Sequence, residues 1–280
     1  MRIIEKLNRL PKRLRNSIAY SFAAIGASST VLSIVGKSLN DFTDNIWYSI
    51  LCVVVVFIVL SILLYLFLGK VYQNSVSMKI GNTKVTIECG DIFEYKGMKV
   101  IGCDSHFDTR VDDIIVSRKS LHGQLVLEHG ETSEIKTAVK TEAERLNLPL
   151  DTEGQYSFPL GTVVKYESSR DGQTYLMLAM TELNKNHESH ISMGKYEHML
   201  EKMWTEISRV YASNDIFIPL LGNGITRIDG TQKDQESLLK CMLCTLNSSG
   251  ITLNSHVTIV LFGDARNISL YEYKDMFRKI

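Results

Sequence analysis

The sequence predicts a two-helix transmembrane hairpin followed by a three-layer α/β domain with a mixed sheet. The first observation is a stretch of apolar and small residues from Ser17 to Leu68, outside which nearly all of the charge lies. The second is an alternation of strand-like and helix-like segments that begins near residue 83. Together they divide the chain into a membrane part and a domain of ordinary composition.

The second half of the apolar stretch, Ile46 to Leu68, contains no Asp, Glu, Lys, Arg or His. A helix of this length reaches about 34 Å, enough to cross the hydrocarbon core of a bilayer. A buried strand would be much shorter. We therefore predict a membrane-spanning helix here.

The first half, Ser17 to Gly36, is also uncharged but richer in small residues. Its pairs Ala23-x-x-x-Ala27 and Gly26-x-x-x-Thr30 have the spacing that lets helices approach closely in lipid. A span that merely pairs with its hairpin partner would have the same composition. A cleaved signal peptide is the other alternative, but the run is long for one and a second span follows closely.

Charge around the two spans predicts their orientation. The loop Lys37 to Asn45 carries one Lys and two Asp, so the positive-inside rule places both chain termini in the cytoplasm. The predicted organisation is a basic cytoplasmic N-terminus (1–16), a hairpin (17–72, with spans 17–36 and 46–68), a connector (73–82) and a ligand-binding domain (83–280). Six basic residues precede the first span: Arg2, Lys6, Arg9, Lys12, Arg13 and Arg15.

Composition excludes some functions. The formal net charge is zero, so we expect no nucleic-acid partner, which would require a basic face. The five cysteines are an odd number without a regular framework, which indicates a reducing compartment. Cys241 and Cys244 form a C-x-x-C within a helical pattern, where packing on one helix face is favoured over metal or redox chemistry. We predict no metal site and no cofactor.

Apolar periodicity places the elements of the large domain. Helices are expected at Ser133–Leu146, Met193–Tyr211 and Gln232–Leu246, the middle one with apolar residues at every third or fourth position. Strands are expected at Lys84–Cys89, Met98–Cys103, Asp113–Val116, Thr162–Tyr166, Gln173–Met180, Asp215–Pro219 and Val257–Phe262.

Three loops after strands carry residues suited to binding. Asp91, in Gly90-Asp91-Ile92, has a carboxylate that would accept from an amine or cap a turn. The loop Ser117 to Gly123 is cationic and suits a phosphate or carboxylate. The loop Pro219 to Ile225 holds two glycines, which let backbone N–H groups approach an anion, although a tight turn explains them as well.

The order of these segments, with Gly-Asp-Ile after one strand and Ile-Pro-Leu-Leu-Gly-Asn-Gly-Ile near the end, resembles the macro domain over roughly residues 83 to 270. Macro domains are α/β folds that bind ADP-ribose. The resemblance implies that Asp91, with Ile92 next to it, lies beside the adenine amine. It also implies that Gly222 to Ile225 wrap the diphosphate.

This chain departs from the macro hydrolases. Where they carry Asn-Ala-Ala-Asn it reads Gly102-Cys103-Asp104-Ser105-His106, and their catalytic glycine run is replaced by Ser117 to Gly123. Asp104 and His106 would still make an acid/base pair, but no nucleophilic residue lies at a recognisable sequence spacing from them. We therefore predict a binding protein with no catalytic residues, not an enzyme. A membrane-tethered enzyme that processes ADP-ribose is the alternative.

The whole chain resembles the transmembrane-macro effectors of Thoeris anti-phage defence systems. The resemblance implies a protein of the bacterial inner membrane whose functional partner, a TIR-domain enzyme, makes an ADP-ribose-type messenger, such as an amino-acid conjugate of ADP-ribose. Binding would drive homo-oligomerisation, membrane disruption and abortive infection; a passive anchor with an interaction module is a further alternative. The expected ligand-binding residues are Asp91, Ile92, Asp104, Ser105, His106, Arg118, Ser120, His122, Gly123, Leu221, Gly222, Asn223, Gly224, Ile225 and Arg227.

Overall fold

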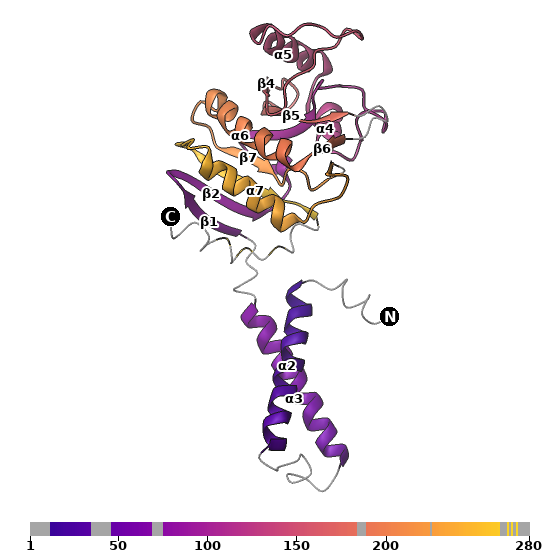
Figure 1. Ribbon diagram of the computed structural model, residues 1–280, viewed down its shortest axis with the longest axis vertical. Helices are drawn as coiled ribbons and strands as arrows, with labels where there is room; N and C mark the ends of the chain where they lie inside the picture. Colours follow the sequence, from indigo (N-terminus) through magenta and orange to yellow (C-terminus); the bar gives the residue numbers. More distant parts are fainter. Residues whose placement is uncertain are drawn as a thin grey trace. The chain divides into compact units, whose positions relative to one another are not determined.

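The computed structural model describes residues 12–34, 46–68, 75–183, 189–224 and 226–263, together with Ile268, Leu270 and Tyr273. The chain divides into two compact units. The first contains the helices α2 (Lys12–Ile34) and α3 (Ile46–Leu68), and the second contains a sheet with its helices (Figure 1). Most of the basic N-terminus, the loop 37–45 and residues 69–74 lie outside the described residues.

Polar and aromatic contacts join α2 to α3. The Ser61 hydroxyl of α3 donates to the Ser21 hydroxyl of α2 at 3.0 Å, and the rings of Phe22 and Phe57 lie 4.5 Å apart. Both predicted helices are present. Within the described residues, however, only the stretch Trp47–Leu68 is long and apolar enough to cross a membrane, so the prediction of two spans is not confirmed for α2.

The second unit is built on a nine-stranded mixed sheet, ordered β1-β2-β9-β7-β3-β5-β6-β8 with β4 also paired to β5. Strands β2, β9, β7, β3 and β5 run parallel, whereas β1 is antiparallel to β2, and β4 and β6 are antiparallel to β5. Strand β8 is parallel to β6. The strands are β1 (Ser75–Ile80), β2 (Thr83–Cys89), β3 (Met98–Asp104), β4 (Val163–Glu167), β5 (Thr174–Leu183), β6 (Ser189–Ile191), β7 (Ile216–Pro219), β8 (Arg227–Ile228) and β9 (His256–Leu261).

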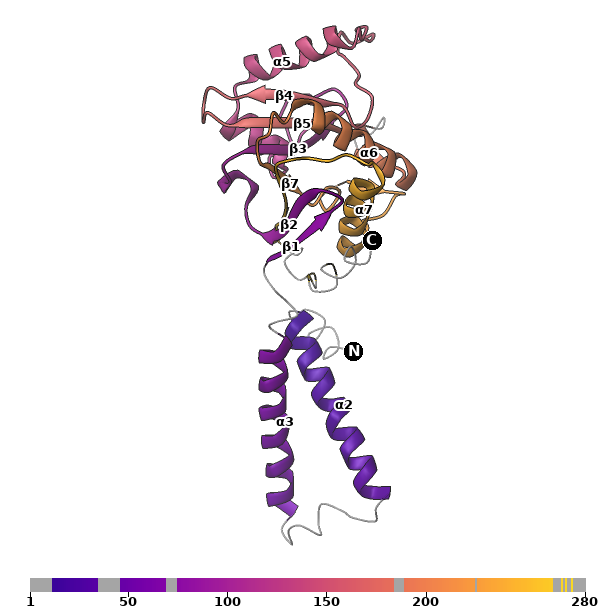
Figure 2. The same ribbon diagram turned by 90° about the vertical axis from the view of Figure 1, so that its left-hand side faces the viewer.

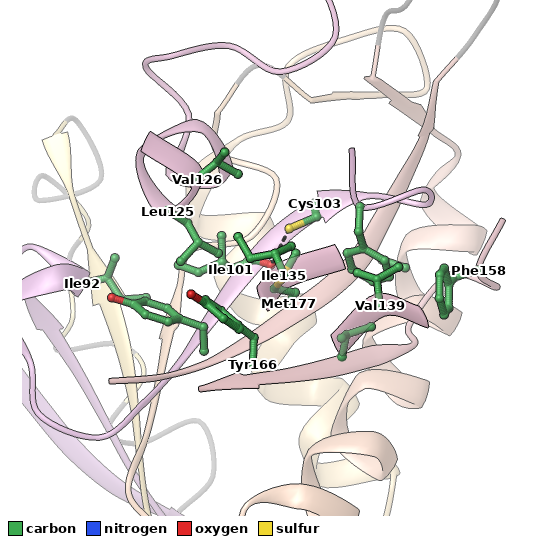
Figure 3. Packing of buried hydrophobic residues seen from close by; sticks show 14 of the residues in the cluster. Ile92, Ile101, Cys103, Leu125, Val126, Ile135, Val139, Phe158, Tyr166 and Met177 are labelled. Carbon is green, nitrogen blue, oxygen red and sulfur yellow. Dashed lines mark hydrogen bonds between the residues drawn. The ribbon is translucent and has the colours of Figure 1, made fainter. Parts of the chain in front are cut away.

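One face of the sheet is covered by α5 (Thr132–Arg145) and the short helices α4 (Leu121–Gln124) and η3 (Leu125–His129). Its core brings Ile135 and Val139 of α5 against alternate residues of β5, including Met177 (Figure 3). Because side chains alternate along a strand, the fully buried Leu176 and Leu178 face the other way.

The helices α6 (Met193–Val210) and α7 (Gln235–Ser248) form the third layer. They run together along one side of the sheet (Figure 2), where α6 contacts β4 and β5 and α7 contacts β1. The buried Trp204 of α6 donates its indole N–H to the Thr245 hydroxyl of α7 at 3.2 Å. The predicted α/β fold with a mixed sheet is therefore confirmed.

Two predicted segments differ from the structure. The expected connector 73–82 contains β1, whose alternate residues Val76, Met78 and Ile80 are buried, so these residues extend the sheet. The expected strand Asp113–Val116 is irregular, because the Asp112 carboxylate accepts two neighbouring backbone N–H groups and folds the chain into a turn.

Candidate functional site

A cavity of about 340 Å³ lies where the parallel strands β3, β7 and β9 reach their carboxyl ends. This edge is where open α/β sheets usually bind ligands. The strand ends contribute Asp104, Pro219 and Val260, and β5 contributes Met180 and Thr181. Two loops complete the cavity, one running from Ile115 into α4 and the other connecting β7 to β8.

Asp104 closes the end of β3. Its carboxylate is buried and accepts backbone hydrogen bonds from His106 at 2.8 Å and from Asp108 at 3.2 Å. The strand register shifts between Cys103 and Asp104, which brings the Ser105 N–H to the carbonyl of Thr181 at 2.8 Å. Asp104 thus holds the following loop and also lines the cavity.

The first loop enters α4 through a capped turn. Ser120 accepts from the Gly123 N–H at 3.0 Å and donates to the Ser117 carbonyl at 2.7 Å. A Cβ at Gly123 would collide with the same carbonyl, so the close turn requires glycine. The turn presents His122 to the cavity.

His122 is buried beside a carboxylate. Its Nδ1 lies 3.8 Å from Asp104 Oδ2, while its Nε2 has no hydrogen-bond partner. Burial lowers the pKa of His122, and the opposing effects of Asp104 and Asp108 are smaller. The lowered pKa favours the neutral ring.

Tyr196 of α6 holds the loop that connects β7 to β8. Its hydroxyl donates a hydrogen bond to the Leu221 carbonyl at 2.9 Å. Gly222 has φ +83°, and a Cβ there would lie 3.3 Å from Ile228 Cδ1, toward the packed interior. A Cβ at Gly224 would meet no atom within 4 Å. The amide oxygen of Asn223 is buried, lines the cavity and has no partner.

Two larger hollows fit a ligand less well. One, of about 650 Å³, lies among α5, β4 and α6, where Glu142 pairs with Arg209 at 2.9 Å. The other, of about 880 Å³, includes His106, which faces Asp151 at 3.8 Å. Several charged groups of these hollows face one another, whereas His122 and Asn223, which line the cavity at the strand ends, keep unpartnered polar atoms.

Comparison with known proteins identifies the family of this chain. A family model described as the macro domain of Thoeris protein ThsA matches residues 85–262. The chain belongs to the Thoeris ThsA family. Thoeris protein ThsA of Bacillus amyloliquefaciens (strain Y2) is 30% identical over 239 residues, which are 81% of this chain and 78% of the relative.

Solved structures support the macro fold of the second unit of this ThsA-family chain. The Oceanobacillus iheyensis macrodomain with ADP has a TM-score of 0.51 at 15% identity, covering 74% of this chain and 98% of that one. The same macrodomain with MES bound has a TM-score of 0.51 at 16% identity, with the same coverage of both chains.

About half of the predicted site residues of this macro domain line the cavity. The loop after β3, α4 and the loop after β7 meet there. The predicted residues that line it are Asp104, Ser120, His122, Leu221, Gly222, Asn223 and Gly224.

The other predicted residues have different surroundings. Asp91 caps the short helix η2 (Ile92–Glu94), accepting from the Phe93 N–H at 3.0 Å, and Ile92 is buried in the core. Ser105, Gly123 and Arg227 are not among the lining residues, and Ile225 lies outside the described part of the chain.

Two predicted polar residues face away from the cavity. Arg118 pairs with Asp113 at 3.4 Å, and the exposed Lys119 replaces it as the cation among the lining residues. His106 lines the neighbouring hollow instead. Sequence reasoning missed the lining residues Met180, Thr181, Thr226, Val260 and Phe262, for which strand patterns carry no signal of a site.

The Cys241-x-x-Cys244 pair lies on α7, away from the cavity residues. Cys241 is half-buried, and burial raises the pKa of its thiol to about 12. A thiol that stays protonated is a poor nucleophile and a poor metal ligand. Packing within α7 accounts for this residue.

Proposed function

We propose that this protein is the membrane effector of a Thoeris anti-phage system. Its macro domain binds an ADP-ribose-type messenger made by a TIR-domain enzyme. Binding promotes homo-oligomerisation of the chain in the bacterial cell membrane, and the assembly disrupts the bilayer and aborts infection. Both chain termini face the cytoplasm.

The observation that carries the proposal is that one chain combines a polar cavity at the strand ends with an apolar helix, α3, most of whose large side chains are exposed. Of the described side chains of α3, only Ser49 and Leu68 are buried. An exposed helix that is apolar all round is unstable in water and stable in lipid. The cavity volume is at the small end of the range for ligand sites.

Ligand chemistry rests on family membership and on the neighbours. One similar macrodomain structure is named with ADP, and the cavity here occupies the sheet edge where α/β folds bind nucleotides. The exposed Lys119 supplies a cation for phosphate, and the Gly222–Gly224 loop brings backbone close to the cavity.

The membrane role of α2 is supported by its hydroxyl groups. Ser28 donates to the Ala24 carbonyl at 2.9 Å and Thr30 donates to the Gly26 carbonyl at 2.9 Å. Hydroxyls satisfied within the helix cost little in hydrocarbon. The uncharged stretch that begins at Ser17 can therefore enter the membrane beside α3.

Coupling between the units requires a difference in affinity. A messenger shifts an assembly equilibrium only if the assembled state binds it more tightly. The proposal therefore predicts that self-association raises the affinity for the messenger by the same factor by which the messenger raises the association constant.

A second candidate is a membrane-tethered enzyme that processes ADP-ribose. The observation in its favour is the His122–Asp104 pair, an imidazole beside a carboxylate inside the cavity. Chromatography of labelled ADP-ribose after incubation separates the two, because the effector returns it unchanged.

The test of the proposal uses the full chain in liposomes loaded with a self-quenching dye. ADP-ribose, or the product mixture of a TIR enzyme acting on NAD, should release the dye and increase the cross-linked size of the protein. Heat-inactivated TIR enzyme is the matched control. Sealed liposomes and an unchanged size in the presence of bound ligand would contradict the effector function.

A further inference from the structure

The cavity contains two buried polar atoms without partners. In the described part of the chain, the buried side-chain atoms that lack a hydrogen bond are Ser49 Oγ, His122 Nε2, Asn223 Oδ1 and Ser255 Oγ. Two of these four line the same cavity. A buried polar group without a hydrogen bond lowers the stability of the fold. Two such groups at one cavity therefore indicate that a ligand forms hydrogen bonds with them.

His122 presents an acceptor. Its Nδ1 is the ring nitrogen that faces Asp104, at 3.8 Å from Oδ2, and the negative carboxylate favours the tautomer with its proton on that side. The lone pair of Nε2 is then directed away from the carboxylate. The His122 side chain is only 6% exposed, so water does not satisfy it freely.

Asn223 presents a second acceptor on the opposite loop. Its backbone is held by its own N–H, which donates to the Leu220 carbonyl at 3.3 Å, and by its carbonyl, which accepts from Gln232 at 3.5 Å. The side-chain oxygen has no partner. A phosphate oxygen, itself an acceptor, would be repelled by both atoms.

We propose that His122 is a specificity-determining residue that accepts a hydrogen bond from an O–H or N–H of the ligand, with Asp104 orienting its ring and Asn223 providing a second acceptor. The inference rests on the proposed function and deepens it. It also corrects the expectation that all of the Ser117–Gly123 loop suits an anion, because His122 rejects a group that carries only acceptors.

The experiment measures binding to the full chain in detergent by calorimetry, with ADP-ribose, ADP and inosine diphosphate as probes. ADP ends in a phosphate that presents only acceptors, whereas ADP-ribose ends in a sugar with hydroxyl donors. Wild type should bind ADP-ribose more tightly, and His122→Phe should weaken this binding about tenfold, the value of one hydrogen bond. His122→Gln, whose amide oxygen accepts, should recover part of the loss.

The probes also identify the donor. If it is a terminal sugar hydroxyl, His122→Phe leaves ADP binding nearly unchanged. If it is the adenine amine, the variant weakens ADP and ADP-ribose equally, and wild type binds inosine diphosphate less tightly than ADP. If it is a hydroxyl of the ribose next to the base, which all three probes share, the variant weakens all three equally. Each of these patterns supports the proposal.

Stability and a control variant separate binding from folding. His122→Phe removes an unsatisfied buried atom, so its Tm without ligand should equal or exceed that of wild type. His198→Phe, on the exposed face of α6 with the side chain 79% exposed, should leave binding unchanged. A His122→Phe variant that binds ADP-ribose like wild type, or that loses affinity only together with its fold, overturns the inference and spares the proposed function. Failure of wild type to bind any of the three probes overturns the inference, and failure to bind the product mixture of a TIR enzyme as well overturns the proposed function.

Discussion

The two units of the chain bury opposite kinds of side chain. In the second unit Val85, Ile87 and Leu176 are completely inaccessible, as expected of a core formed in water. In the first unit the large apolar side chains of α3 point outward, while the hydroxyls of Ser17 and Ser21 are buried against the helix pair. The comparison teaches that the second unit hides its apolar side chains in an interior, whereas the first unit leaves the apolar surface of α3 exposed.

The two tryptophans of the chain offer the largest expected effect, because each unit has one. Trp204 is fully buried, whereas Trp47 is 76% exposed. Trp204→Ala should destabilise the second unit by about 3–5 kcal/mol. Trp47→Ala should leave that unit unchanged. Urea unfolding of the full chain in detergent, followed by circular dichroism, measures both, and equal losses would contradict the comparison.

A charge in the first unit should prevent membrane insertion without affecting the fold of the second. Val55 lies midway along α3 and is half-exposed. Val55→Arg should cost roughly 2.5–3.5 kcal/mol of insertion free energy. Carbonate extraction of membranes should therefore release the variant, while Val55→Leu stays in the pellet. ADP-ribose affinity should be equal in both; loss of binding in the arginine variant alone would mean that the units do not fold independently.

Substitutions of Asp91 test whether the residue that caps η2 also binds the ligand. Asp91→Ala should lower the unfolding free energy of the second unit by about 1 kcal/mol, because the Phe93 N–H loses its acceptor. It should also weaken ADP-ribose binding by about 1–3 kcal/mol if the carboxylate lies beside the adenine amine. Asp91→Asn keeps the cap but not the charge, so it should lose affinity and retain stability. Full affinity in Asp91→Asn would remove this residue from the site.

Gly26 should show the smallest effect on the single chain. A Cβ at this position meets no atom within 4 Å, so Gly26→Leu should not disturb the packing of α2 against α3. If copies of the chain pack through the small residues of α2, the larger side chain will hold them apart. Cross-linking in liposomes with ADP-ribose should then show smaller assemblies. Assemblies of wild-type size would place the contact between copies elsewhere.

Sequence alone determined the features that depend on local pattern. A charge-free run longer than any strand predicted α3, and short apolar runs predicted β2, β3 and β9 to within a residue or two at each end. The glycine loop after β7 was predicted as a binding loop, and it lines the cavity. These features follow from neighbours in the chain, so the tertiary structure was not needed to find them.

The tertiary structure alone decided which residues meet. The sheet places β7 between β9 and β3, and this order brings Val260, Pro219 and Asp104 to one cavity from three distant parts of the chain. The role of His122 likewise depends on its burial beside Asp104, where a residue expected to attract anions becomes a neutral acceptor. Burial and strand order are properties of the packed chain, because the desolvation of a side chain depends on residues far away in sequence.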